Sequence, residues 1–286
     1  MPCGLIIPGV SLAIIMLASG VFVVIPSYNE EQHLPTLLPQ IARVVAATGH
    51  PLKMFVIDDG SRDQTKNVAV KLAETLPIQV ISHPTNLGVG RVFLTGLRAA
   101  VEVAAASDII ILMEADHTND PELLPEFIRR IDAGDDVVIG SRYVAGGRYK
   151  KFPFKRLLLS LGANASMRLL FPIPHARDYT IFYRAYRAAV LAKSFEILGD
   201  NLIMTRTFVC NAELLIKLDH LQRLRISETP LVYRYDLKRG KSKMPILKTI
   251  REYFAFVSQV KRTLRGVTSA SRKGDCVIEP KPTKSG

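Results

Sequence analysis

The chain has 286 residues, of which 48% are hydrophobic, and it carries a formal net charge of +12 with a pI near 9.7. This length allows one substantial hydrophobic core, and the positive charge favours anionic partners such as phosphorylated substrates or a membrane surface. The sequence has no recognisable RNA- or DNA-binding motif, so nucleic acid is not a predicted partner. The three cysteines, Cys3, Cys210 and Cys276, are widely scattered, which argues against a disulfide framework or a cysteine zinc site.

The N-terminal segment is apolar and contains no charged side chain before Glu30. Residues 4–25 are nominally long enough to cross a bilayer, which takes about 20 residues. However, Val21–Ile25 is also needed as the first strand of the domain, and a secretory signal would carry a basic region that is missing here. We therefore predict an apolar leader at residues 1–20, with a hydrophobic anchor or a cleaved signal as the alternatives.

Apolar runs and helical periodicity alternate from residue 21 to about residue 140. The runs predict strands at residues 21–25, 54–57, 78–82, 108–113 and 137–140. The segments between them place apolar residues at helical spacing, which predicts helices at residues 34–45, 65–76, 92–104 and 121–131. This alternation is typical of an α/β fold with a Rossmann-like, mostly parallel sheet and helices on both faces.

The pattern is less regular after residue 141. A basic stretch at residues 150–156 precedes a predicted apolar helix at 157–170, and a further helix and strand are predicted at 205–221 and 224–232. Apolar residues between 246 and 257, flanked by lysines and arginines, predict a basic amphipathic helix. Such a helix either lies at a membrane interface or packs on the domain with a solvated basic face. The predicted parts of the chain are a leader (1–20), one α/β domain (21–235), a basic amphipathic segment (236–266) and a disordered tail (267–286).

Acidic residues follow three of the predicted strands. These are Glu30 and Glu31 after the first strand, Asp58 and Asp59 after the second, and Glu114 and Asp116 after the fourth. Because the carboxyl ends of parallel strands meet at one edge of a sheet, we expect these side chains to converge there. Clustered carboxylates repel one another unless a cation or a donor-rich ligand lies among them. The sequence therefore predicts an enzyme that holds a metal ion and a nucleotide-like substrate.

Four motifs carry a resemblance to a known family. They are Val24–Glu31, Val56–Ser61, Asn86–Gly90 and the triplet Glu114-Ala115-Asp116. In order and spacing they resemble the family-two glycosyltransferases of the GT-A fold, and among these the dolichol-phosphate or polyprenyl-phosphate mannosyltransferases. Supporting matches are Ile139–Tyr143, the pair Asp178 and Thr180, and Gly240–Lys243. The resemblance identifies residues 21–235 as a GT-A glycosyltransferase domain.

The resemblance implies a hexosyltransferase that moves mannose or glucose from a GDP- or UDP-sugar to a polyprenyl or dolichyl phosphate. The positions that match its nucleotide-sugar site are Pro26, Tyr28, Glu30, Val56, Asp58, Ala115, Arg142 and Lys243. Glu114 and Asp116 match the signature that holds Mg²⁺ or Mn²⁺ on the sugar nucleotide. Asp116 and Arg142 are the predicted catalytic residues, because the metal and a cation would stabilise the departing diphosphate.

Cations on both sides of the predicted helix at 157–170 suggest where a lipid phosphate would bind. We predict that Arg156 and Arg184 contact the acceptor phosphate, since this segment offers positive charge beside apolar surface. A lipid phosphate is already anionic and needs no general base, and the sequence shows no dedicated base. The enzyme would then be cytoplasmic and peripherally associated with the cytoplasmic face of a membrane.

The sequence also departs from the family pattern. Glu114 replaces an aspartate, Ile181 and Phe182 replace a Ser-Gly pair, and Leu237 replaces an arginine. These changes leave two alternatives open. One is a glycosyltransferase that acts on a sugar hydroxyl of a cell-envelope glycan or glycolipid, for which Asp178 would be the candidate base. The other is a non-catalytic nucleotide-binding protein with a degenerate site.

Overall fold

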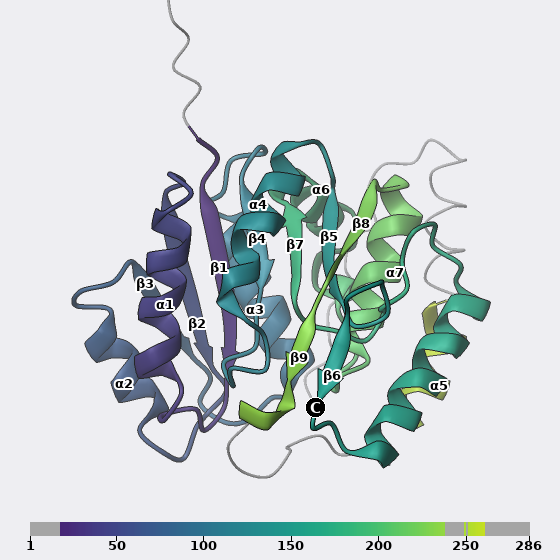
Figure 1. Ribbon diagram of the computed structural model, residues 1–286, viewed down its shortest axis with the longest axis horizontal. Coiled ribbons are helices and arrows are strands. Elements are labelled where there is room, and N and C mark those ends of the chain that lie inside the picture. The colour runs from purple at the N-terminus through teal and green to yellow at the C-terminus, as the bar shows by residue number, and fades with distance from the viewer. Residues whose placement is uncertain (1–17, 238–248, 250, 261–286) are drawn as a thin grey trace, which may run out of the picture.

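The computed structural model describes residues 18–237, 249 and 251–260 (Figure 1). Nearly all of the predicted leader, the predicted tail and Lys243 lie outside these residues. Within them, no helix is both long enough and apolar enough to cross a bilayer.

A seven-stranded sheet forms the centre of the domain. Its strands are β1 (Val21–Ser27), β2 (Leu52–Asp58), β3 (Ile78–Ser82), β4 (Ile109–Leu112), β5 (Val137–Ser141), β7 (Arg184–Arg187) and β8 (Ile226–Pro230). They are arranged in the order β3-β2-β1-β4-β7-β5-β8, and only β7 in this sheet runs antiparallel to its neighbours. A separate parallel pair joins β6 (Arg148–Lys150) and β9 (Val232–Arg234). The sheet is therefore mostly parallel, as the sequence predicts.

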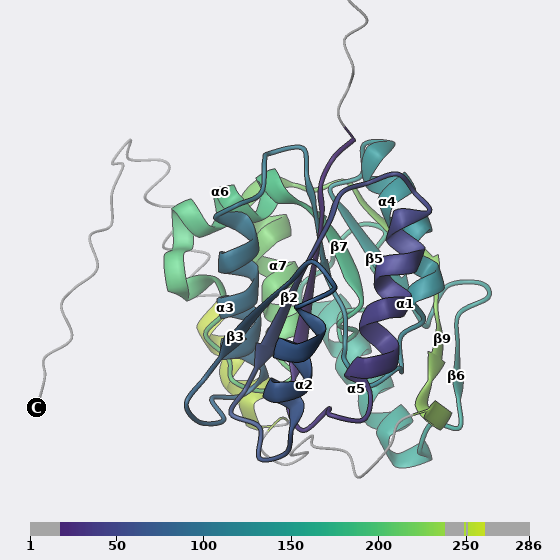
Figure 2. The same cartoon turned by 90° about the vertical axis from the view of Figure 1, so that its left-hand side faces the viewer.

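Helices cover both faces of the sheet, and this also agrees with the prediction (Figure 2). Figure 2 shows α1 (Leu34–Ala46) and α4 (Leu124–Asp132) on one face. The opposite face carries α3 (Val89–Val101), α6 (Ala188–Leu198) and α7 (Cys210–Gln222). The short α2 (Thr65–Leu72) lies by the β3 edge, and the long α5 (Phe154–Leu170) extends below the other end of the sheet in Figure 1. Residues 251–260 form a further helix, and three short 3-10 segments are Pro121–Leu123, Gly199–Leu202 and Tyr235–Leu237.

The central strands consist of apolar residues because both of their faces are buried. All residues of β4 are buried, and its neighbour β1 is buried at most positions. Gly96 lets α3 pack closely on the sheet, since a Cβ there would contact the side chains of Val24 and Ile57. The strand directions place the carboxyl ends of β1, β2, β4 and β5 at one edge, the lower edge in Figure 1.

Two predicted elements differ from the structure. The helix predicted at 205–221 begins only at Cys210, because the backbone before it forms a loop that is hydrogen-bonded to glutamates. The strand predicted at 224–232 is two strands, β8 and β9, which separate at Leu231 and join different sheets.

Candidate active site

A cavity of about 1080 Å³ opens at the carboxyl edge of the sheet. Its polar lining comes from residues that follow β1, β2 and β4, which include Glu30, Asp59, Glu114 and Asp116. Its apolar lining comes largely from α5 and from the helix at 251–260. The acidic residues that follow three separate strands are thus brought to one cavity, as the sequence predicts.

The loop after β1 is fixed against the loop after β2. The backbone N–H of Asn29 donates to Ser61 Oγ at 2.9 Å, and that of Glu30 donates to Thr65 Oγ1 at 2.7 Å. Asn29 has a positive φ of 53°, a left-handed conformation that asparagine tolerates better than most residues. The end of β1 and this loop present Pro26, Tyr28 and Glu30 to the cavity, where these three residues were predicted to meet a nucleotide.

The second acidic pair differs from the prediction. Asp58 does not line the cavity, and its Oδ1 accepts a hydrogen bond from the backbone N–H of Ser61. The cavity is lined instead by Asp59, which the sequence places among the converging carboxylates but which was not assigned to the nucleotide-sugar site. Asp59 accepts from the backbone N–H groups of Leu87 and Gly88 and hydrogen-bonds to His83. It therefore also anchors the loop that begins α3.

Glu114 and Asp116 share a hydrogen-bond partner. Thr118 Oγ1 lies 2.6 Å from Asp116 Oδ1 and 3.1 Å from Glu114 Oε2. Asn119 Nδ2 and the Tyr233 hydroxyl also donate to Glu114 Oε2, at 3.2 and 3.4 Å. Burial, together with the negative charge of Glu114 and Asp116, raises the pKa of Tyr233 well above its ordinary value, so this tyrosine remains a donor.

The donor atoms of this pair suit Mg²⁺ or Mn²⁺. Oxygen ligands are the ones that these ions prefer, and Mg²⁺ is commonly held by one or two carboxylates together with substrate phosphates. No cluster of three or more acidic, histidine or cysteine side chains that could hold a metal occurs among the residues described by the structure. For an ion bound at this pair, Glu114 and Asp116 would be the protein's ligands, and substrate oxygens and water would supply the others.

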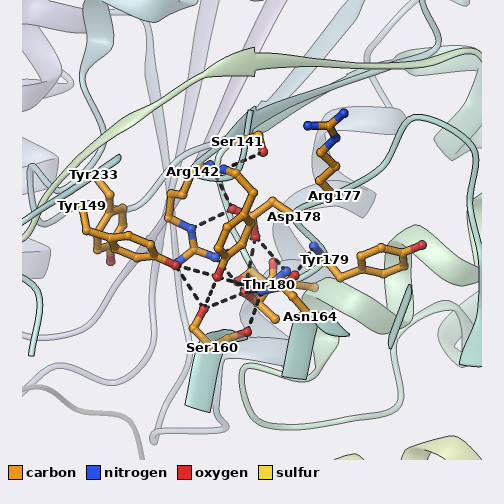
Figure 3. A network of polar contacts seen from close by, with 12 residues as sticks. Ser141, Arg142, Tyr149, Ser160, Asn164, Arg177, Asp178, Tyr179, Thr180 and Tyr233 are labelled. Atoms are coloured by element: carbon orange, nitrogen blue, oxygen red, sulfur yellow. Dashed lines mark hydrogen bonds and ion pairs between the residues drawn. The ribbon is translucent and has the colours of Figure 1, made fainter. Parts of the chain in front are cut away.

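Arg142 forms a buried ion pair at the centre of a polar network (Figure 3). Its Nε donates to Asp178 Oδ2 and its Nη2 donates to Asp178 Oδ1, each at 2.7 Å, and Nη2 also donates to Thr180 Oγ1. The rings of Tyr149, Tyr143 and Tyr233 lie 5.0 to 5.6 Å from its guanidinium carbon. Burial alone would lower the pKa of Arg142, but the charge and hydrogen bonds of Asp178 more than offset it and raise the pKa. Arg142 lines the cavity as predicted, already paired with a carboxylate.

The same network attaches α5 to the sheet. Asn164 on α5 donates to Thr180 Oγ1 at 2.9 Å and accepts from the backbone N–H of Tyr179 at 2.7 Å. Ser160, one turn earlier, lies within 3.3 Å of the hydroxyls of Tyr143 and Tyr149. Figure 3 shows these groups arranged around Arg142. Sequence reasoning did not select Tyr149, Ser160 or Tyr233, because isolated hydroxyls on two short strands and a helix carry no local pattern.

Besides Asp58, two further predicted site residues are placed elsewhere by the structure. Arg184 is fully buried in β7, where its guanidinium donates to the backbone carbonyls of Asn211 and Asp178. This burial contradicts its predicted contact with an acceptor phosphate. Val56 is also fully buried, inside β2, so its side chain has no access to a nucleotide. Arg156, Ala115 and the metal pair do line the cavity, whereas Lys243 lies outside the described residues.

The model of the family described as Glycosyl transferase family 2 matches residues 22–195. The chain belongs to glycosyl transferase family 2. The match spans β1, β2, β4 and β5, whose ends form the cavity, and continues into α6. The family predicted from the motifs is thereby confirmed.

Curated relatives carry names from the polyprenol-phosphate branch of this family. The chain is 35% identical to a polyprenol monophosphomannose synthase of Mycolicibacterium smegmatis, over 60% of this chain and 63% of that protein. It is 32% identical to a dolichol-phosphate mannosyltransferase of Pyrococcus furiosus, over 83% of this chain and 62% of that protein. It is 29% identical to an undecaprenyl-phosphate mannosyltransferase of Micrococcus luteus, over 78% of this chain and 87% of that protein. The chain thus spans somewhat less than two thirds of the first two relatives.

Solved structures support the fold. Glucosyl-3-phosphoglycerate synthase from Mycobacterium tuberculosis, solved with Mn²⁺, UDP-glucose and phosphoglyceric acid, superposes with a TM-score of 0.58 at 19% identity. The superposition covers 87% of this chain and 79% of that one. The GT-A type of α/β fold predicted from the sequence is therefore confirmed.

Proposed function

We propose that this protein is a glycosyltransferase that moves a hexose from a nucleotide sugar to a polyprenyl phosphate, with Mg²⁺ or Mn²⁺ as cofactor. One observation carries the proposal: a single cavity joins a carboxylate-lined polar end to an apolar end between α5 and the helix at 251–260. A sugar nucleotide with its metal fits the chemistry of the polar end. The isoprenoid chain of a lipid phosphate fits the apolar end, with its phosphate directed toward the polar end. The names of the curated relatives agree with this substrate class.

The residues of the polar end have separate tasks in this proposal. Pro26, Tyr28 and Glu30 would hold the nucleoside, because an apolar ring, an aromatic ring and a carboxylate can stack on and bond to a base and ribose. Glu114 and Asp116 would hold the metal, which supplies positive charge to the diphosphate as it departs. Arg142 would orient a phosphate oxygen through the edge of its guanidinium, while Asp178 keeps that guanidinium in one position.

The state of Asp178 favours a phosphate acceptor over a hydroxyl acceptor. A sugar hydroxyl must lose its proton to a base, and Asp178 was the candidate. Asp178 is fully buried, and both of its carboxylate oxygens accept from Arg142. Asp178 is not among the residues that line the cavity, and both of its oxygens are already occupied, so it is not placed to take a proton from a substrate hydroxyl. An acceptor that arrives as an anion removes the need for a base.

Exposed apolar residues beside the cavity support peripheral association with a membrane. On α5, Phe154 and Leu169 are 71% and 82% exposed, and on the helix at 251–260 Phe254 is 77% exposed. Phe256 of the same helix is buried, so this helix both packs on the domain and presents an apolar side chain. Lys151, Lys155 and Arg168 lie on or next to α5, where they could meet anionic head groups.

A substrate panel tests the proposal. Purified protein is incubated with GDP-mannose, GDP-glucose, UDP-glucose or UDP-mannose and a polyprenyl phosphate, with and without Mn²⁺, and glycolipid is measured. We expect one sugar nucleotide to give product only when the metal is present. Transfer to a sugar hydroxyl but never to the lipid would reject the acceptor, and binding of nucleotide without any transfer would favour the non-catalytic alternative.

A further inference from the structure

The arginines that line the cavity differ in their partners. Arg142 is neutralised by Asp178, and Arg156 on α5 is the predicted acceptor contact. Arg206 also lines the cavity, but its side chain is exposed and has no hydrogen bond or ion pair with any other described residue. The function proposed above gives this arginine no role.

The loop that carries Arg206 is held in place by two carboxylates. Glu213 on α7 accepts from the backbone N–H groups of Met204 and Thr205, at 3.0 and 2.9 Å. Glu213 is itself buried and paired with Lys217 one turn further along α7. On the other side of the loop, Glu252 accepts from the backbone N–H groups of Arg206 and Thr207, each at 2.9 Å. The backbone N–H groups of residues 204–207 are therefore all bound by glutamates from two helices.

The same loop packs against the first turn of α3. The backbone N–H of Gly90 points to the carbonyl oxygen of Arg206, and a Cβ at Gly88 would lie 2.7 Å from that oxygen. Gly88 and Asn86, which begin this part of the chain, line the cavity together with Arg206. Two helices and the first turn of α3 therefore hold the backbone around Arg206, and its side chain lines the cavity without a described partner.

We propose that Arg206 binds a phosphate oxygen of the reacting molecules and that Glu252 is the positioning residue that holds it in place. This proposal rests on the glycosyl transfer proposed above. The polar end of the cavity contains four carboxylates, so an anionic ligand needs nearby positive charge. Arg142 has its charge matched by Asp178, whereas Arg206 does not share its charge with any described carboxylate. A guanidinium offers the planar donors that phosphate oxygens accept best. The phosphate belongs either to the diphosphate of the sugar nucleotide or to the acceptor lipid.

Replacement of Arg206 tests the proposal and identifies the phosphate. Arg206→Ala should weaken the binding of one substrate by about 10- to 100-fold, which is the loss expected for a charged hydrogen bond. Arg206→Lys should weaken the binding of that substrate less. If the KM of the sugar nucleotide and the Kd of GDP or UDP with Mn²⁺ both rise, the phosphate is the diphosphate. If only the KM of the polyprenyl phosphate rises, it is the acceptor phosphate. The control is Arg43→Ala, an exposed arginine on α1 that pairs with Glu122 and should change neither constant.

The outcomes separate this inference from the proposed function. Unchanged KM values and unchanged nucleotide Kd in a folded Arg206→Ala variant would overturn the role of Arg206, even if the wild type makes glycolipid. If the wild type makes no glycolipid, the proposed function fails, and the Kd of GDP and UDP decides for or against Arg206.

A double-mutant cycle tests the role of Glu252. Glu252→Gln should raise the same KM as Arg206→Ala by a smaller factor, because one carboxylate oxygen that accepts from the loop is replaced by a donor. In the double variant the two effects should not add, since Glu252 acts through Arg206. Fully additive effects, or a fall in kcat without any change in KM, would reject the positioning role.

Discussion

Arg142 and Asp178 illustrate how a buried charge is tolerated in this site. Both side chains are almost wholly buried, and two parallel hydrogen bonds join them. The aromatic faces of Tyr149 and its neighbours surround the guanidinium, which favours a cation further. Such a pair contributes little net stability, but removal of one partner leaves a buried charge without compensation. Its value lies in keeping the guanidinium in one orientation.

We expect Asp178→Asn to destabilise the protein by about 3–5 kcal/mol, because the charge of Arg142 would remain buried without a carboxylate. Thermal or urea unfolding measures this loss. The double replacement Arg142→Met with Asp178→Leu should recover much of the stability, since no charge then remains buried, but it should not recover transfer activity. If Asp178→Asn has the same free energy of unfolding as the wild type, the charge of Arg142 does not depend on Asp178 for its compensation.

The metal pair gives a second prediction at this scale. Asp116→Ala should abolish transfer and weaken binding of Mn²⁺ together with GDP or UDP by at least ten-fold, while the thermal unfolding temperature stays close to that of the wild type. Glu114→Asp restores the residue of the family signature, and we expect it to be tolerated or to improve activity. Titration calorimetry with Mn²⁺ and nucleotide measures binding separately from turnover. An Asp116→Ala variant that keeps most of its activity would show that the metal assignment is wrong.

At the scale of elements, contact between α3 and the loop at residues 204–207 shapes the cavity wall. Gly90→Ala should be clearly destabilising, because the new methyl group would overlap the carbonyl oxygen of Thr205. The matched control is Gly162→Ala on α5, where an added methyl group would meet no atom within 4 Å. That control should stabilise the fold by about 0.5–1 kcal/mol, since alanine favours helix over glycine. In urea unfolding, the free energy of unfolding should fall for Gly90→Ala and rise for Gly162→Ala. Equal changes in the two variants would mean that the close contact at Gly90 is relaxed in solution.

The sequence predicts β1, β2, β4 and β5 well because the core of each strand is a continuous apolar run. It does not predict β7, whose residues Arg184–Arg187 include two arginines and resemble a surface loop. The strand exists because Arg184 finds two backbone carbonyls inside the domain and because its neighbours β4 and β5 supply the remaining pairing. Such a partner set is a tertiary property and leaves no local signal.

The site was predictable where a motif ends a strand. Glu30, Glu114 and Asp116 reach the cavity because their strands carry them to its edge. The choice between Asp58 and Asp59 was not predictable, since alternation along β2 decides which carboxylate turns inward to Ser61 and which faces the cavity. Arg206 was also missed, because contacts with other elements hold its loop in place. Glu213 belongs to α7, and Glu252 lies far along the sequence, so neither contact leaves a local pattern.

At the scale of the whole molecule, the apolar end of the cavity and the three most exposed large apolar side chains of the described residues lie on the same two helices. Leu158 and Leu170 of α5 line the cavity and are also partly exposed. Phe254 on the helix at 251–260 likewise lines the cavity and is exposed. With a net charge of +12, the protein should be drawn to anionic bilayers. If α5 rests on the bilayer, a lipid acceptor can enter the cavity without leaving the membrane.

This orientation can be tested with vesicles. Co-sedimentation with vesicles that contain an anionic lipid should be strong at low salt and should weaken as salt rises, because each lysine or arginine near the surface contributes about 1 kcal/mol through a screened interaction. Equal binding to neutral and anionic vesicles would reject the electrostatic part of this association. Absence of binding to both kinds of vesicle would reject the proposed association with a membrane.

The apolar part of the association is tested by a charge placed on α5. Leu169 is 82% exposed on α5, so Leu169→Glu should leave folding unchanged but reduce vesicle binding at high salt, where apolar insertion carries more of the affinity. Val103, two residues beyond the end of α3, is 53% exposed, and Val103→Glu makes the same change of charge outside α5. If α5 is the contact surface, Leu169→Glu should lower vesicle binding and raise the KM for polyprenyl phosphate, because a lipid acceptor is concentrated only for an enzyme that sits on the bilayer. The KM for the sugar nucleotide should not change, since that substrate arrives from water. If Leu169→Glu and Val103→Glu weaken vesicle binding equally, the attraction comes from net charge alone and α5 has no special role.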